Sequence, residues 1–519
     1  MKRWMFLLAG FALASNMAWG NGITVTNVTL INTDKGLGTT DVQFDISWSN
    51  SWRASWDEDG IGTNWDAAWV FVKFRASGGD WYHAWLTPSE HWAPTGSEIA
   101  VGTNGGGTNV GAFIYRSADG QGPLNLSGVR LCWNYAANGV PRTNQIDVSV
   151  QAIEMVYVPQ GSFYVGSGGE ESGSFTDGAW TSGTTFPFRI TSEAALTISN
   201  SAGCLWGTST SGNNTIGDAG VLSNAFPKGF GAFYCMKYEI TQGQYRDFLN
   251  MLTRAQQNTR TASQAADYFA MSANASIQYR NGIRCPSIIP SVPDVIVFGC
   301  DANANKIFDE TDDAMDRACN YLSWADGVAL ADWAGLRPLT ELEFEKACRG
   351  PKTPVANEYA WGNTTISATT AIENDGTGTE TATGGNCNYN SCLVDGPYRA
   401  GIYATGSSSR LSAGASYWGI MELSGSLWER CVTVGNGAGR SFQGTHGDGL
   451  LNSSGNPTGN LDWPLYSTAD GAGSRGGAWR NTSDYARGSD RTDAANVYAT
   501  RYHNIGWRGG RVAPSGVGP

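Results

Sequence analysis

An oxygen-rich segment at 301–312 carries the side chains best suited to binding a metal ion. Its side-chain donors are Asp301, Asn303, Asn305, Asp309 and Asp312, and Ile307 can add a backbone carbonyl. Calcium takes six to eight oxygens, and this spacing resembles that of an EF-hand loop. Lys306 replaces the loop's usual glycine and Asp312 replaces its bidentate glutamate, so an acidic turn without metal is the alternative.

The ten cysteines offer a second kind of chemistry. An even number favours disulfides in an exported chain, and Cys387 and Cys392 are close enough in sequence to staple a local loop. A zinc site is disfavoured, because no Cys-x2-Cys pair occurs and the four histidines are scattered.

The first residues predict export. Lys2 and Arg3 precede an apolar run, and Ala18-Trp19-Gly20 forms a small-residue end, which together indicate a secretory signal peptide over residues 1–20. We therefore expect a periplasmic or extracellular protein with no transmembrane segment after the signal is removed. The formal charge of −12 disfavours nucleic acid as a partner.

Six short β-rich runs occupy the N-terminal part, at 23–31, 41–48, 68–74, 110–115, 128–135 and 146–153. In the second run, polar Asp41, Gln43 and Asp45 alternate with apolar neighbours, the pattern of a strand with one solvated face. These runs predict an antiparallel, sandwich-like domain over 21–153 without a catalytic constellation.

Three helices are predicted in the remainder of the chain. Capping boxes formed by Thr241 with Gln244, Ser323 with Asp326, and Thr340 with Glu343 mark their starts, and Gly335 and Gly350 mark the ends of the second and third. The 68 glycines indicate that most of the other backbone is irregular.

Seven segments resemble, in order, the formylglycine-generating enzyme (sulfatase-modifying factor) family. They are MVYVPQGSFYVGS (155–167), FYCMKYEITQGQYRDFL (233–249), NYLSWADGVALADWAGLRPLTELEFEKACRG (320–350), YAWGN (359–363), YWGIMELSGSLWER (417–430), SRGGAWRN (474–481) and GWRGGR (506–511). The resemblance implies an irregular C-type-lectin-like domain of this family over 154–519. With the all-β sandwich-like domain that the strand pattern predicts over 21–153, the chain is expected to be α+β.

Catalytic members of the family hold copper with two cysteines after a Gly-Gly-Ser segment and oxidise a substrate cysteine. Here Ala478 replaces the serine, Asn481 stands where the first cysteine is expected, and no cysteine follows Cys431. Thiolates are what Cu(I) requires, so copper and the family's oxidase chemistry are not expected.

The resemblance implies two structural calcium sites besides the segment at 301–312. Glu422, Gly425, Leu427 and Glu429 match one of them, and Asn388, Tyr389, Asp395 and Pro397 match the other, the last through its carbonyl.

The C-terminal segment also resembles variable C-type-lectin-fold proteins of diversity-generating retroelements, which display a ligand-binding face there. The candidate ligand-binding residues are Trp479, Asn481, Tyr485, Arg487, Tyr498, Arg501, Tyr502, His503 and Trp507, with ordinary polar surface as the alternative. We therefore expect an exported, non-catalytic protein that binds or displays a glycan or protein ligand. The alternatives are a sulfatase-modifying oxidase and a variable lectin-fold binding protein.

Overall fold

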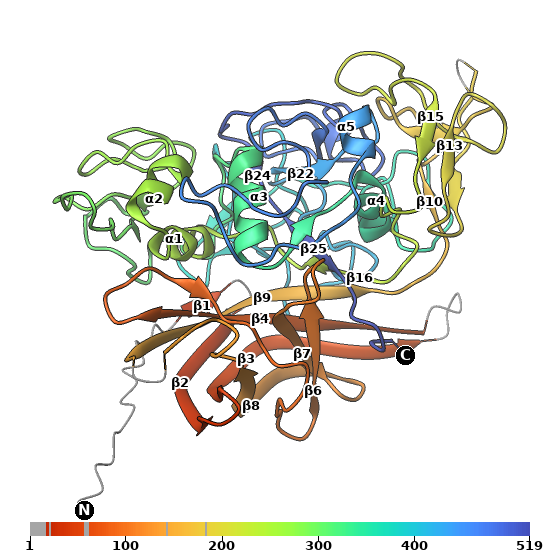
Figure 1. The fold of residues 1–519 in the computed structure, drawn as a ribbon. Helices are drawn as coiled ribbons and strands as arrows, with labels where there is room; N and C mark the ends of the chain where they lie inside the picture. The colour runs from red at the N-terminus through yellow and green to blue at the C-terminus, as the bar shows by residue number, and fades with distance from the viewer. Residues whose placement is uncertain (1–16, 20–21, 57–61, 142–143, 182–183, 519) are drawn as a thin grey trace, which may run out of the picture.

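The computed structural model describes residues 17–19, 22–56, 62–141, 144–181 and 184–518, in which strands greatly outnumber helices (Figure 1). The expected signal peptide lies outside these residues except for β1 (Met17–Trp19), which pairs with β2 (Ile23–Asp34). No helix in the described part of the chain has the length and apolar character needed to cross a bilayer.

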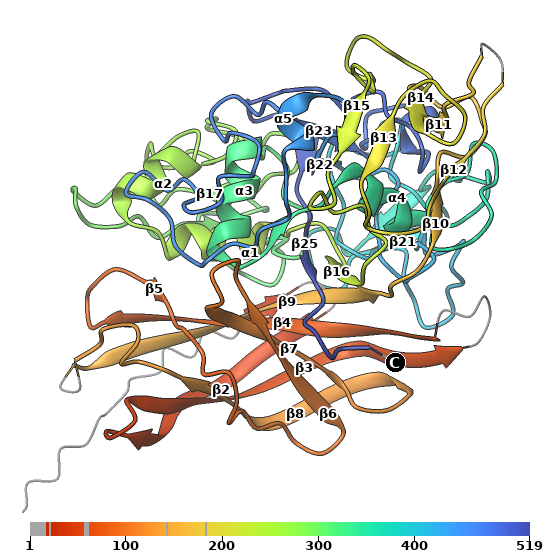
Figure 2. The ribbon, with the colours of Figure 1, turned by 45° about the vertical axis from the view of Figure 1, so that its right-hand side comes forward.

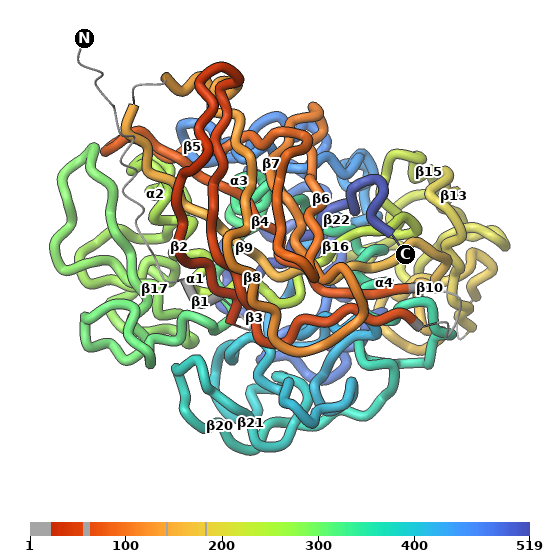
Figure 3. Tube along the Cα trace, turned by 90° about the horizontal axis from the view of Figure 1, so that it is seen from below, coloured from red at the N-terminus to blue at the C-terminus, as the bar shows by residue number. Residues whose placement is uncertain are grey.

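The predicted β-rich runs all form strands, and these strands lie in two layers (Figure 3). One layer contains β2, β3 (Thr39–Trp56) and β8 (Gly120–Trp133). The other contains β4 (Gly62–Ala76), β5 (Tyr82–His83), β6 (Ser97–Thr103), β7 (Asn109–Arg116) and β9 (Ile146–Val158). Apolar side chains from both layers form one core between them.

Strand β4 separates two hydrophobic cores. Val70 and Val72 face the core between the layers, whereas Trp65 and Trp69 face the rest of the chain. The Trp69 indole donates to the Ala334 carbonyl at 2.7 Å. Because successive strand residues point to opposite faces, one strand can bury apolar side chains on both sides.

Strand β9 runs through the domain boundary expected at 153/154 and continues the sheet into the second half of the chain. It pairs with β16 (Phe233–Met236), which pairs with β25 (Gly509–Val512), and β25 pairs with β19 (Arg337–Pro338). The helices lie above this sheet, on the side away from β2 and β8 (Figure 2). The two parts are therefore joined by backbone hydrogen bonds as well as by side-chain packing.

The three predicted helices are confirmed as α1 (Gln242–Asn250), α3 (Trp324–Trp333) and α4 (Glu341–Arg349), each with the capping box expected from its sequence. Gly335 follows α3 with φ of +69°, the left-handed conformation that glycine adopts without a Cβ clash. Two more helices are present, α2 (Arg254–Arg260) and α5 (Gly437–Arg440).

Short strands and long loops make up the remainder. The further strands are β10 (Phe163–Val165), β11 (Phe175–Asp177), β12 (Phe188–Ile190), β13 (Leu196–Ile198), β14 (Leu205–Gly207), β15 (Gly220–Leu222), β17 (Ile283–Arg284), β18 (Gly299–Cys300), β20 (Ala371–Glu373), β21 (Thr381–Thr383), β22 (Trp428–Val432), β23 (Ala472–Arg475) and β24 (Ile505–Gly506).

The expected disulfides are not formed in this structure, where all ten cysteines are free thiols. The Cys387 sulfur lies 3.1 Å from the Ser424 carbonyl, and the Cys392 sulfur lies 3.7 Å from the Tyr398 hydroxyl. Each sulfur thus has its own polar contact, and the local staple expected between the two thiols is not formed in this structure.

Candidate functional site

A three-stranded sheet frames the candidate site. Its central strand β22 pairs antiparallel with β23 and parallel with β24, which places Arg430 opposite Ser474 and Trp428 opposite Ile505. Trp428 and Arg430 share one face of β22, whereas Glu429 and Cys431 must point to the other because strand side chains alternate.

The first face opens into a pocket of about 310 Å³. It is lined by Trp428, Arg430, Ser474, Arg480, Asn481, Asp493, Asn496, Tyr498, Tyr502, Asn504 and Ile505. Two arginines and one carboxylate leave one positive charge in excess, in a chain whose formal charge is −12. The pocket volume is at the lower end of the range of about 300–1,000 Å³ typical of small-molecule sites.

Arg430 lies deepest among the charged residues of this pocket. It is 1% exposed, and none of its three guanidinium nitrogens has a hydrogen-bond partner among the described residues. Burial lowers its pKa to about 10, an effect that the negative charge of Asp493 opposes only in part. The guanidinium therefore remains charged at neutral pH without a bonded counterion.

Two amide oxygens in the pocket are also unsatisfied. The Oδ1 atoms of Asn481 and Asn504 are buried and accept no hydrogen bond from the described residues. Buried polar atoms normally have partners, so such atoms at a pocket wall are available to a ligand. Together with Arg430, they give the pocket both donors and acceptors.

Aromatic rings extend from the pocket to the surface. Tyr498 and Tyr502 lie stacked with ring centroids 6.4 Å apart, and both are about half exposed. Tyr502 packs on His503, whose Nε2 accepts a 2.5 Å hydrogen bond from Arg480. Burial and the Arg480 charge lower the pKa of His503 to about 4, so the imidazole is neutral at pH 7. Because the Arg480 guanidinium can only donate, Nε2 is the acceptor and the ring proton is assigned to Nδ1.

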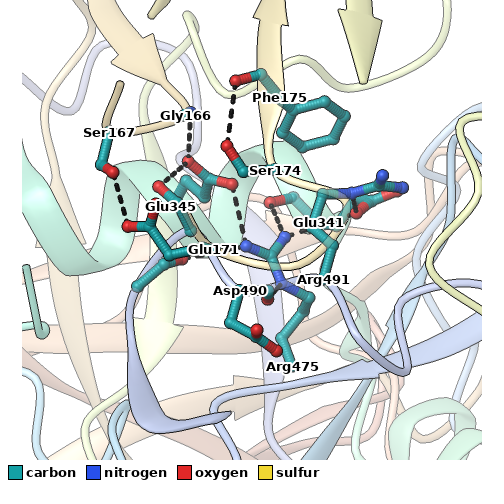
Figure 4. A network of polar contacts seen from close by, with 12 residues as sticks. Gly166, Ser167, Glu171, Ser174, Phe175, Glu341, Glu345, Arg475, Asp490 and Arg491 are labelled. Carbon is teal, nitrogen blue, oxygen red and sulfur yellow. Dashed lines mark hydrogen bonds and ion pairs between the residues drawn. The ribbon is translucent and has the colours of Figure 1, made fainter. Parts of the chain in front are cut away.

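A buried ion network on the far side of the sheet fixes the strands that carry the site (Figure 4). Arg475 of β23 donates to Glu345 of α4 at 2.8 Å, and Arg491 donates to Glu341 at 2.7 Å. Burial would raise the pKa of Glu341, but the charges of Arg491 and Arg475 hold it below its usual value. This network anchors β23 directly before the Gly476-Gly477 turn that leads into the pocket wall.

The structure brings together only part of the predicted ligand face. Asn481, Tyr498 and Tyr502 line the pocket, and His503 contacts it through Arg480. Trp479 and Trp507 are fully buried core residues.

Three further candidates lie outside the pocket lining. Tyr485 packs edge-on against Trp428. Arg487 pairs with Asp484 at 2.6 Å, and Arg501 pairs with Asp326 of α3 at 2.8 Å. These two arginines thus have partners within the chain.

Sequence reasoning did not single out Arg430 or Trp428 as site residues. A signal was present, since a charged residue two positions after a tryptophan in a short buried strand must share that tryptophan's face. Arg480, Asn496 and Asn504 were also missed, because nothing in their spacing distinguishes them from ordinary polar loop residues.

The two calcium positions implied by the family contain buried oxygens. Glu422 Oε2, Glu429 Oε2 and Asn388 Oδ1 are buried and have no hydrogen-bond partner among the described residues. Burial raises the pKa of Glu422 to about 7. Arg508 bonds Glu429 Oε1 at 2.7 Å and supplies part of the compensating charge. Unpartnered buried oxygens are of the chemical type that a hard cation binds. No group of three acidic, histidine or cysteine side chains suited to a metal occurs in the described chain, so calcium at these positions stays a prediction.

The segment at 301–312 is held by two arginines. Arg284 pairs with Asp301 Oδ2 at 2.5 Å, and Arg246 pairs with Asp309. Asp301 Oδ1 is buried and has no hydrogen-bond partner in the described part of the chain. Two of the expected calcium ligands therefore already have cationic neighbours, and calcium at this segment stays a prediction.

The fold and the pocket together define an irregular α+β protein with a pocket on one face of a small three-stranded sheet. The model of the sulfatase-modifying factor enzyme 1-like domain matches residues 207–511, more than half of the chain, and the chain belongs to this family. No curated protein matches the chain.

The family's copper chemistry has no thiol to use in the described pocket. Asn481 lines the wall where the resemblance implies the first cysteine, and no lining residue is a cysteine. Cys431 is buried on the opposite face of β22, where burial raises the pKa of its thiol. A Cu(I) site needs thiolates, so the residues present do not fit copper.

Proposed function

We propose that the chain is an exported, non-catalytic ligand-binding or surface-display protein that uses the pocket behind β22. The observation that carries this proposal is a pocket with unsatisfied donors and acceptors, aromatic rings at its mouth and no thiol in its lining. Seven of its eleven lining residues are polar or charged and the others are Trp428, Tyr498, Tyr502 and Ile505, so the pocket suits a polar ligand that also presents an apolar face. The strands at 23–153 would act as a rigid base, since β9 carries their sheet into the family domain.

We propose further that structural calcium binds at the family positions around Glu429 and Asn388. Their unpartnered buried oxygens support this role, and ion coordination would offset the ordering cost of the long loops around them. Export rests on the signal-like sequence of residues 1–20 alone.

Binding is tested by screening the purified chain against a glycan array and immobilised surface proteins. We expect at least one component to be retained, and retention to be lost in Asn496→Trp, which fills the pocket from its rim. Leu461→Trp is the matched control, because Leu461 is 99% exposed and outside the pocket lining. Failure of the wild-type chain to retain any component would refute the proposal.

Absence of oxidase chemistry is tested separately. The chain is incubated with copper, oxygen and a cysteine-containing sulfatase peptide, and the peptide mass is followed. We expect no thiol-to-aldehyde change, and its appearance would show that the chain is catalytic after all.

A further inference from the structure

The unpaired charge of Arg430 is the feature of the pocket that no contact within the chain explains. Four other fully buried arginines have glutamate partners: Arg337 with Glu343, Arg475 with Glu345, Arg491 with Glu341, and Arg508 with Glu429. A fifth, Arg511, donates to the backbone carbonyls of Gly335 and Thr103. Arg430 is equally buried, yet no described group bonds its guanidinium. A buried ion without a partner is unfavourable, so the pocket is incomplete until an anion enters it.

The geometry of the Arg430 guanidinium limits which class of anion can pair with it. Its planar fork matches the two oxygens of a carboxylate, which it can bind through two parallel hydrogen bonds. Asp493 is the one acidic residue in the lining, and its charge partly offsets the burial of Arg430, but its carboxylate accepts from the Asn496 amide and forms no ion pair with the guanidinium. A directly bonded counterion would therefore come with the ligand.

The other unsatisfied atoms of the pocket are hydrogen-bond acceptors, so a ligand must supply donors to pair with them. Asn481 Oδ1 and Asn504 Oδ1 can accept from hydroxyl groups, and the half-exposed Tyr498 ring, which is stacked on Tyr502, offers an apolar face at the mouth. A sugar ring supplies several hydroxyl donors at its edge and an apolar face of C–H groups that packs on aromatic rings. A peptide carboxylate would satisfy Arg430 but would bring fewer donors for the two amide oxygens.

We propose that the pocket binds a glycan bearing a sugar acid, with the carboxylate on Arg430 and the ring hydroxyls on Asn481 and Asn504. The ring face packs against the half-exposed Tyr498 ring. This inference rests on the proposed binding function and specifies its ligand class.

The test measures the affinity of the purified full chain for three small probes by ligand-observed NMR titration. The probes are methyl β-D-glucuronide, the neutral methyl β-D-glucoside, and N-acetylglutamate as a carboxylate of peptide type. We expect the glucuronide to bind about ten-fold more tightly than the glucoside, the preference that one charge-assisted bidentate pair provides. Arg430→Met is expected to abolish that preference, whereas Arg189→Met, at an exposed arginine outside the pocket, leaves it unchanged.

Each other outcome overturns the inference. Equal binding of glucuronide and glucoside, or a preference that survives Arg430→Met, removes the role of the carboxylate. Tighter binding of N-acetylglutamate than of the glucuronide assigns the pocket to acidic peptides. If no probe binds, the ligand is not a sugar acid, while a component retained on the array would still uphold the proposed function.

Discussion

Replacing Arg430 with methionine is expected to stabilise the ligand-free protein. Burial lowers the pKa of this arginine from its usual 12.5 to about 10, which corresponds to a destabilisation of about 3 kcal/mol at neutral pH. Methionine removes the charge and retains most of the apolar volume, and a small residual void costs about 1 kcal/mol. The net expected gain is about 2 kcal/mol.

The change is measured as the midpoint of thermal unfolding by calorimetry without ligand. An unfolding entropy of ~2.1 cal/mol/K per residue gives roughly 1 kcal/mol/K for 519 residues, so the midpoint should rise by about 2 °C. Because the folded pKa lies below the unfolded one, the penalty is complete below about pH 10 and is relieved as pH rises toward 12.5.

Arg475→Met is the matched control for this measurement. Arg475 is as deeply buried as Arg430, but its removal leaves the carboxylates of Glu341 and Glu345 with less compensation, which should cost about 3–5 kcal/mol. The two variants should therefore shift the midpoint in opposite directions. A midpoint that falls in Arg430→Met would refute the reasoning, since it would mean that the guanidinium has a stabilising partner within the folded chain.

Four further predictions address other parts of the molecule. Calcium added after chelation should raise the unfolding midpoint by about 2–3 °C at a hundred-fold excess over Kd, and an unchanged midpoint would argue against structural calcium. His503 has a folded pKa of about 4 against an ordinary 6.5, so protonation favours the unfolded state as pH falls from 6.5 to 4. His503→Asn should therefore lose less stability than the wild type in urea unfolding between about pH 7 and about pH 5, and an equal loss counts against the low pKa. Gly102→Ala should destabilise the chain by about 1–3 kcal/mol in denaturant titration, because its Cβ would lie 2.7 Å from the Trp69 ring; an unaltered midpoint would show that the ring can move. Ellman's reagent should detect ten thiols after denaturation, with Cys204 and Cys392 reacting first in the native state; fewer than ten would reveal disulfides.

The sequence predicted the local structure of this chain better than its site. The capping boxes that start at Thr241, Ser323 and Thr340 depend on side chains three residues apart, so they could be read directly and are present in the structure. The pairing of β9 with β16 could not be predicted from the sequence, because it joins segments about 80 residues apart through backbone hydrogen bonds. Arg501 was proposed as a ligand residue although it pairs with Asp326, since a partner distant in sequence leaves no local signal.

Strand register explains why two arginines on neighbouring strands have different roles. The pairing of β22 with β23 sets Glu429 opposite Arg475 and Arg430 opposite Ser474, so the two arginines lie on opposite faces of the same small sheet. The face of Arg475 is closed by glutamates of α4, and its charge stabilises the fold. The face of Arg430 meets the pocket, where a serine stands opposite it and no carboxylate is bonded. If β22 slipped by one residue, Arg430 would move to the face of the α4 glutamates and away from the pocket. The strand pairing therefore decides which arginine is neutralised within the fold and which one faces the pocket.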